Sequence, residues 1–303
     1  MKIQYRVIEL EFSGVPTPES LDFAYQEYVT RLKASSVTKR GAGIERHDYG
    51  DEAPLSSGQE RMWFVQMRDP ESVAFNIPRW LRIRGPLDVR AMRLSMQALV
   101  DRHEVLRTNI WESDGEPFQK ILPVGTAVDW TSFDATTLEE LQGWKWIDAF
   151  CWKPFELESE APIRIALVKE SAESHVLVLV LHHIAMDAWS DQIIRSEAFA
   201  NYAAIVEGQE LQQEQLPIQY ADYAIWQREQ LGGEAFGRGL DFWKENLEGA
   251  PEILGHPAAR SVDEDKIAIA GTVRSIWSSQ IISRMESLAA EENTTLFVAL
   301  TAG

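Results

Sequence analysis

The residue types best suited to chemistry lie together in one stretch, residues 182–190 (HHIAMDAWS). An imidazole has a pKa near neutrality, so it can accept a proton or orient an attacking group through a hydrogen bond. Neighbouring side chains of a strand point to opposite faces, which makes His182 and His183 poor joint ligands for one metal ion. We therefore expect one histidine to be packed and the other to face a surface or a tunnel.

A plainer interpretation competes with this one, in which two core histidines lie beside an Asp187 that caps a helix. The HxxxD spacing is short, and a histidine near a strand end is common, so the spacing alone favours the plainer interpretation. The flanking sequence places the stretch between a buried strand over residues 175–181 (HVLVLVL) and a helix over residues 190–205. Such strand ends are where α/β folds usually keep their chemistry.

The composition is that of an ordinary globular protein, with 45% hydrophobic and 25% charged residues. The net charge of −18 argues against nucleic acid and anionic membranes as partners, because both require a basic face. A single cysteine, Cys151, excludes an internal disulfide and a cysteine metal cluster, and we expect no metal and no directly bound cofactor. The N-terminus lacks the apolar core of a signal peptide, and no apolar run reaches membrane-spanning length, so a cytoplasmic location is expected.

The chain is expected to have three parts. Residues 1–52 form an appendage and linker, which is either a docking segment or a simple extended tail. Residues 53–264 form the main lobe and its connecting helices, and residues 265–303 begin a second lobe. That second part contains one expected strand and two helices, which cannot close a sheet of their own, so we expect the second lobe to be incomplete.

Hydrophobic periodicity and turn residues predict the elements within these parts. Strands are expected over 1–12, 78–84, 105–111, 117–122, 162–169, 175–181 and 267–277. Helices are expected over 21–32, from Asp88 to about Leu99, and over 138–152, 190–205, 218–230, 238–248, 279–291 and 294–302. Asp114-Gly115 predicts a hairpin turn between two of the strands.

Four stretches of the chain together resemble the motifs of one family, the condensation domains of nonribosomal peptide synthetases. Residues 56–63 (SSGQERMW) resemble S-x-A-Q-x-R-[LM]-W, and residues 102–108 (RHEVLRT) resemble R-H-E-x-L-R-T. Residues 182–190 resemble H-H-x-x-x-D-G-W-S, and residues 220–227 (YADYAIWQ) resemble Y-x-D-Y-A-x-W-Q. The resemblance covers about residues 53–303 and is supported by PFEL at 154–157 and PIR at 162–164.

This resemblance implies an α/β fold of the chloramphenicol acetyltransferase type, in which two lobes, each a mixed sheet with helices, form a V. It implies that donor and acceptor peptidyl carrier proteins insert phosphopantetheine arms into a tunnel from opposite sides. The acceptor amine then attacks the donor thioester beside the histidine motif. An adenylation domain in the same assembly line would supply the activated residues.

The resemblance also implies roles within the catalytic motif His182, His183 and Asp187. His183 corresponds to the catalytic histidine, which either takes the proton of the attacking amine or orients that amine. His182 is expected to be structural. Asp187 is expected to pair with an arginine that braces the loop, Arg102 or Arg107, with Arg102 favoured.

The rest of the active-site loop is Ala188, Trp189 and Ser190. Ala188 stands where the family usually has glycine, and its methyl group is expected to narrow the tunnel or tilt the loop. Trp63, Tyr223 and Trp226, which belong to the other motifs, are expected to be packing residues.

Three other functions compete with amide formation. A related acyltransferase would use a carrier or coenzyme A donor and form an ester or a small-molecule amide. A degenerate module would only dock carrier proteins, which the truncation and Ala188 would favour. A serine hydrolase using Ser190 is disfavoured, because the chain lacks a G-x-S-x-G elbow.

Overall fold

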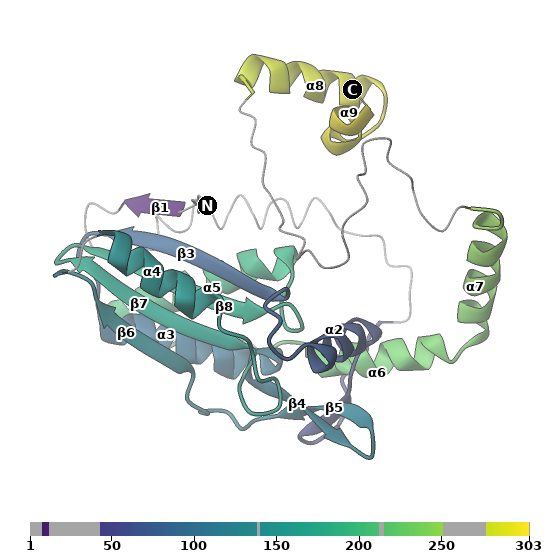
Figure 1. Cartoon of the computed structure of the whole chain (residues 1–303), viewed down its shortest axis with the longest axis horizontal. Coiled ribbons are helices and arrows are strands. Elements are labelled where there is room, and N and C mark those ends of the chain that lie inside the picture. Colours follow the sequence, from purple (N-terminus) through teal and green to yellow (C-terminus); the bar gives the residue numbers. More distant parts are fainter. Residues whose placement is uncertain (1–7, 12–42, 138–139, 212–214, 251–276, 303) are drawn as a thin grey trace, which may run out of the picture. The chain divides into compact units, whose positions relative to one another are not determined.

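The computed structural model of the protein describes residues 8–11, 43–137, 140–211, 215–250 and 277–302. The chain divides into two compact units, Met1–Asn246 and Leu247–Gly303 (Figure 1). The histidine motif belongs to the first unit. The expected boundary at residue 264, the expected helix over 21–32 and nearly all of the expected strand over 267–277 lie outside the described residues.

A five-stranded mixed sheet forms the centre of the first unit, in the order β1-β3-β8-β7-β6 (Figure 1). Its strands are β1 (Ile8–Glu11), β3 (Asn76–Arg84), β8 (Ser174–His182), β7 (Ile163–Ser171) and β6 (Asp129–Asp134). β8 is antiparallel to both β3 and β7, whereas β1 and β6 add parallel strands at the two edges. Part of the expected appendage therefore joins the main sheet through β1.

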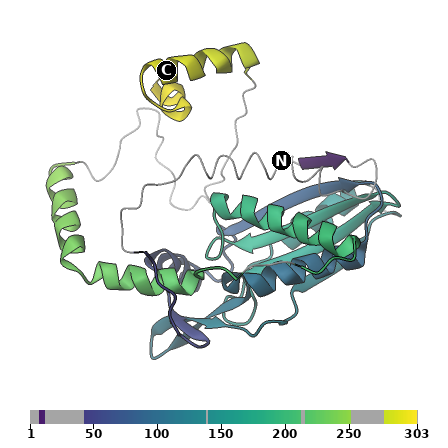
Figure 2. The ribbon, with the colours of Figure 1, turned by 180° about the vertical axis from the view of Figure 1, so that it is seen from behind.

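Helices cover both faces of this sheet, which explains why the sequence of β8 is a continuous apolar run rather than an alternating one. The helices α3 (Val89–Arg102) and α5 (Ala188–Val206) lie on one face of the sheet (Figure 2). Leu177, Leu179 and Leu181 of β8 pack in one cluster with residues of these two helices. The intervening Val176, Val178 and Val180 pack in a second cluster that includes α4 (Glu140–Cys151). Alternate residues of one strand thus serve two separate cores.

A smaller sheet accompanies the main one, in the order β2-β5-β4. Its strands are β2 (Glu52–Pro54), β5 (Glu116–Ile121) and β4 (Thr108–Ser113). The predicted hairpin is confirmed, because Asp114 and Gly115 both have positive φ, 54° and 83°, as a tight β4–β5 turn requires. The expected strand over 105–111 is wrong at its start, where the chain forms a short 3₁₀ helix, Glu104–Arg107, closed by a bond from Leu106 N to His103 O of 2.9 Å.

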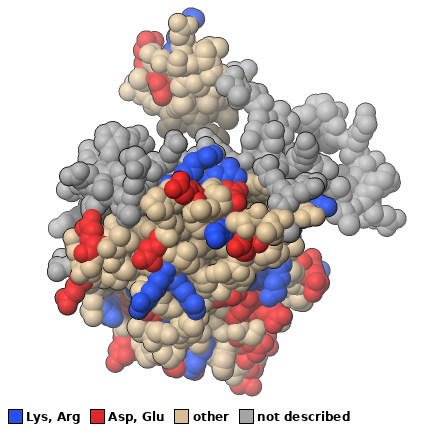
Figure 3. Space-filling view, turned by 90° about the vertical axis from the view of Figure 1, so that its left-hand side faces the viewer, with Lys and Arg blue, Asp and Glu red and all other residues tan. Residues whose placement is uncertain are grey.

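The described part of the first unit contains three further helices: α2 (Ser57–Arg68), α6 (Tyr220–Leu231) and α7 (Glu234–Asn246). α6 packs against both α2 and β2. The helix α2 was not expected from hydrophobic periodicity, although Ser56 and Gln59 form a capping box at its start. Figure 3 shows acidic and basic side chains interspersed on the face of the molecule that it presents.

The second unit contains two described helices, α8 (Ser279–Glu291) and α9 (Leu296–Ala302). Both were predicted, with α9 beginning at Leu296 rather than at residue 294. Ala289 is the one buried residue in the described part of this unit. Among the described residues of the whole chain, no helix combines the length and apolar composition that a bilayer crossing needs.

Candidate active site

The backbone of the histidine motif continues the sheet as far as His182 and then turns. His182 N donates to Pro162 O at 3.0 Å, and His183 N donates to Phe75 O at 2.8 Å. β8 ends at His182, and His183 is the first residue of the turn. Their exposure differs sharply, because His182 is 0% exposed whereas the side chain of His183 is exposed. The structure therefore buries one histidine and exposes the other, as predicted.

His182 occupies a dry, aromatic site. Phe75 and Phe155 contact its ring edge-on, with centroids at 5.6 and 5.7 Å. Its Nδ1 accepts a hydrogen bond from Ile184 N at 3.1 Å, which puts the proton of the neutral ring on Nε2. Burial lowers the pKa of His182 to about 4, with the charges of His183 and Arg164 as smaller causes. His182 is thus a neutral packing group that fixes the turn.

Asp187 caps α5. Its Oδ1 accepts from Ser190 N at 2.8 Å and from Ser190 Oγ at 2.7 Å, and these two bonds are the main reason that the pKa of Asp187 is lowered. A capping box completes the arrangement, because the Ser190 hydroxyl oxygen lies 3.4 Å from Asp187 N. The same contacts fix the start of the helix two residues earlier than the expected start at residue 190.

Among the residues that the structure describes, Asp187 pairs with neither of its two expected partners, Arg102 and Arg107. Arg102 Nε instead lies 3.3 Å from Glu197 Oε2, to which His103 Nε2 is also bonded at 2.7 Å. Glu197 lies about 15 Å further along α5 than Asp187, at 1.5 Å per helical residue. Arg107 lies 3.6 Å from Glu104 and also donates to backbone carbonyls. The two arginines brace α3, α5 and the 3₁₀ turn rather than the aspartate.

Ala188 is the first residue of α5 and is exposed. Among described residues other than glycine, only Asp114 and Asn293 have positive φ, so the backbone at Ala188 does not require glycine. Its neighbour Trp189 is 59% exposed and therefore lies outside the buried face of the helix. The buried face of α5 is formed by Ile194, Ala198, Phe199, Asn201, Tyr202 and Ala203.

The fourth motif lies on α6 and is hydrogen-bonded to the first motif, which lies at the start of α2. Tyr220 OH bonds Ser56 Oγ at 2.9 Å, and Gln227 Oε1 accepts from Ser57 N at 2.8 Å. The predicted packing role of Tyr223 agrees with its ring contacts to Tyr220 and Trp226, at 5.4 and 5.9 Å.

Gln219, the residue just before α6, is hydrogen-bonded to the second motif. Gln219 Nε2 donates to Arg102 O at 2.9 Å, and Gln219 Oε1 accepts from Glu104 N at 3.2 Å. Asp222, 0% exposed, accepts from the backbone nitrogens of Gln219 and His47 at 2.7 and 2.6 Å.

The first motif in turn contacts the histidine turn. Gln59, 2% exposed, donates from Nε2 to Ile184 O at 3.5 Å and to Gln119 Oε1 at 3.4 Å. Four stretches that are distant in sequence therefore form one hydrogen-bonded assembly around the turn between β8 and α5.

Sequence reasoning missed the part played by Arg164. This arginine lies in β7, is 1% exposed, and packs its guanidinium carbon 3.7 Å from the centroid of Phe155, the residue that covers His182. The available signal was a charged residue within the apolar run at residues 163–168, because a charge must be paired if it is buried.

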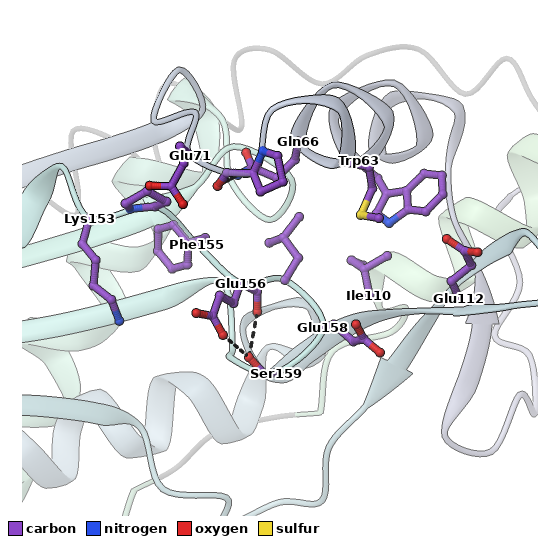
Figure 4. Close-up of a pocket in the computed structure, with 14 residues that line it drawn as sticks. Trp63, Gln66, Glu71, Ile110, Glu112, Lys153, Phe155, Glu156, Glu158 and Ser159 are labelled. Atoms are coloured by element: carbon purple, nitrogen blue, oxygen red, sulfur yellow. Dashed lines mark hydrogen bonds between the residues drawn. The ribbon is translucent and has the colours of Figure 1, made fainter.

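A cavity of about 610 Å³ borders Phe155 (Figure 4). It is bounded by α2, β4 and the segment 153–159, and His183 is not among its lining residues. Its wall is apolar at Trp63, Ile110 and Phe155. The cavity and the exposed histidine are therefore separate features of this lobe.

Comparison with known proteins agrees with this architecture. The profile of the family described as "Condensation domain" matches residues 49–302. A linear gramicidin synthase of Brevibacillus parabrevis is 36% identical over 288 residues, which are 91% of this chain and 6% of that protein. The chain therefore belongs to the condensation domain family of nonribosomal peptide synthetases and spans a small part of the synthetases that it matches.

Two solved structures share the fold over about half of their length. The X-domain from teicoplanin biosynthesis, in complex with OxyB, has a TM-score of 0.71 and 25% identity, covering 86% of this chain and 57% of that one. The first condensation domain of the calcium-dependent antibiotic synthetase, in complex with a substrate analogue, has a TM-score of 0.66 and covers 81% of this chain and 58% of that one. Its 21% identity shows the fold alone. The predicted chloramphenicol acetyltransferase-like α/β lobe, a mixed sheet flanked by helices, is confirmed.

Proposed function

We propose that this chain provides the condensation activity of a peptide synthetase, forming an amide bond between a carrier-bound acyl or peptidyl thioester and a carrier-bound aminoacyl acceptor. The observation that carries the proposal is the division between the two histidines. His182 is buried and neutral, and it fixes a turn from which His183 is presented to solvent. Membership of the condensation domain family supports the same reaction.

The chemistry assigns one step to His183. The acceptor amine attacks the carbonyl carbon of the donor thioester, so a C–N bond forms, the C–S bond breaks and the sulfur leaves as the phosphopantetheine thiol. The attacking nitrogen must lose a proton, and the leaving sulfur must gain one. His183 either carries this proton from nitrogen to sulfur, or it orients the amine through a hydrogen bond while the proton passes to the sulfur. Asp187 acts on this step only through the helix cap that it builds with Ser190.

The partners under this proposal are donor and acceptor peptidyl carrier proteins that bring phosphopantetheine-bound substrates, with an adenylation domain in the same assembly line. The proposed location is the cytoplasm, where such a synthetase meets its substrates. No cofactor is assigned to the chain's own residues.

The proposal is tested with His183→Ala in the intact polypeptide, supplied with loaded donor and acceptor carriers and assayed by mass spectrometry of the amide product. Loss of general acid–base assistance predicts a rate lower by about 10²-fold or more. His47→Ala is the control, because it removes an imidazole outside the motif. A folded His183→Ala variant with unchanged turnover contradicts the assignment.

The second candidate is a module that binds partner proteins without catalysis. One observation favours it: the similar X-domain from teicoplanin biosynthesis is described in complex with another protein, OxyB. Ala188, where the family usually has glycine, points the same way. Carrier binding with no product from any loaded pair, in a wild-type protein that melts cooperatively, would select this candidate. Product formed only with an alcohol acceptor or with coenzyme A would select the related acyltransferase.

A further inference from the structure

Arg164 is a deeply buried cation at the second position of β7, among apolar neighbours. It is 1% exposed, and the neighbouring β7 residues Ile163 and Ile165 are 0% exposed. A buried guanidinium is costly to desolvate, so it is retained only where good geometry and several hydrogen bonds compensate for the cost. Its partners therefore indicate what it does.

The guanidinium of Arg164 forms an ion pair with one carboxylate and also donates hydrogen bonds to two backbone carbonyls of one turn. Arg164 Nε and Nη2 donate to the two carboxylate oxygens of Glu160 at 3.1 and 2.9 Å, a bidentate pair. Its Nη1 donates to Lys153 O at 2.8 Å, and Nη2 also donates to Pro154 O. The Lys153 carbonyl also accepts from Asn76 Nδ2 at 2.9 Å, and Asn76 lies opposite His182 in the β3–β8 register.

The same guanidinium lies over the face of an aromatic ring that covers His182. Its carbon is 3.7 Å from the Phe155 centroid, and the Phe155 ring contacts His182 edge-on at 5.7 Å. Arg164, Phe155 and His182 thus form three successive layers. Phe75 also contacts the imidazole, at 5.6 Å.

We propose that Arg164 is a positioning residue for the histidine motif: it clamps the turn at residues 153–155 so that Phe155 seals His182 away from water. His182 then stays neutral and accepts the Ile184 N–H, and this bond sets the direction in which the chain presents His183. The role in presenting His183 rests on the function proposed above, whereas the sealing of His182 does not.

The electrostatics of His182 agree with this role. Its pKa is lowered to about 4 by burial first, then by the charges of His183 and Arg164, the two titratable or charged groups that act on it. Loss of the guanidinium would remove a positive charge and admit water, and both changes raise the pKa of His182 toward its ordinary value of about 6.5.

The experiment is NMR titration of ¹⁵N-labelled histidine rings in Arg164→Met, Arg164→Lys and the matched control Arg82→Met. Arg82 suits this purpose because it lies in the same sheet, forms a bidentate pair with Glu170 and lies 5.9 Å from the ring of Trp144. In the wild type and in Arg82→Met we expect the His182 signals to stay constant from about pH 8 to about pH 5. In Arg164→Met they shift with a midpoint inside that range, and in Arg164→Lys the shift is smaller.

Phe155→Leu keeps the ion pair and removes only the aromatic seal, so it also raises the midpoint and serves if Arg164→Met does not fold. A folded Arg164→Met or Phe155→Leu variant whose His182 signals stay constant down to pH 5 overturns the proposal. Amide formation by Arg164→Met is measured in parallel and should fall while His183 is intact. If the wild type forms no amide, the proposed function fails, but the titration still decides the role of Arg164.

Discussion

Strand β8 and the turn that follows it are continuous in sequence but are stabilised in different ways. Every residue from His175 to His182 is buried. Within residues 183–190, only Ile184 and Met186 are buried, and the others are exposed or half-buried. The strand is held by apolar area on both faces. The turn is held by a few specific hydrogen bonds, above all those of Asp187 with Ser190. The candidate catalytic residue therefore lies where substitution changes presentation more than folding.

The largest loss of unfolding free energy is expected from the substitution Leu181→Ala, near the end of β8. Leu181 is 0% exposed, and removing a buried leucine side chain leaves a cavity that costs about 2–5 kcal/mol of unfolding free energy. Urea denaturation at neutral pH measures it. A loss below about 1 kcal/mol would show that the core near the turn is looser than its burial indicates.

Acid is expected to have a slightly smaller effect, through His182. Its pKa is lowered to about 4 in the folded protein, so the unfolded chain, with a pKa near 6.5, binds the proton first. Stability from this group is complete above about pH 6.5 and falls as the pH drops toward 4, by at most about 3 kcal/mol. Urea denaturation midpoints at about pH 7 and pH 5 test this in the wild type and in His182→Gln. The acid sensitivity that remains in His182→Gln comes from other groups and is subtracted from that of the wild type. An equal acid sensitivity of His182→Gln and the wild type contradicts the assignment.

Asp187→Ala is expected to cost about 1 kcal/mol, the usual value of a lost helix N-cap. This is a smaller effect than a buried ion pair with Arg102 would give, since breaking such a pair costs about 3–5 kcal/mol. Asp187→Asn, which keeps a capping oxygen, is the matched control and should lose much less stability. A loss above about 3 kcal/mol in Asp187→Ala would restore the ion-pair interpretation.

The smallest effect is expected at Trp189, despite the size of its side chain. The indole is 59% exposed, so Trp189→Ala should change the unfolding free energy by less than about 0.5 kcal/mol. Thermal melting of this variant beside Leu181→Ala measures the contrast between turn and strand. A drop in melting temperature comparable to that of Leu181→Ala would remove the distinction between them.

Local sequence patterns predicted the elements around the site well. The apolar run of β8, the Asp88 cap of α3 and the Asp114-Gly115 turn each encode their structure within a few residues. The alternation of side chains on a strand also predicted that only one histidine would be presented.

The failures concern contacts that the local sequence does not encode. An arginine near a motif can pair with any acid that the fold brings close, and for Arg102 that acid is Glu197 rather than Asp187. The aromatic cover of His182 comes from Phe75 and Phe155, which are distant in sequence and have no polar chemistry to reveal them. The edge strand β6 was missed because its sequence, DWTSFD, has no apolar run.

The alternation of β8 between two cores has a consequence for register. Its leucines face α3 and α5, whereas its valines face the cluster of α4 and Phe155. A shift by one residue would force leucines into spaces shaped for valine and leave voids on the other face. The same shift would bury His183 and expose His182. The difference of one methylene between leucine and valine, repeated along the strand, therefore favours the register in which His183, rather than His182, is exposed to solvent.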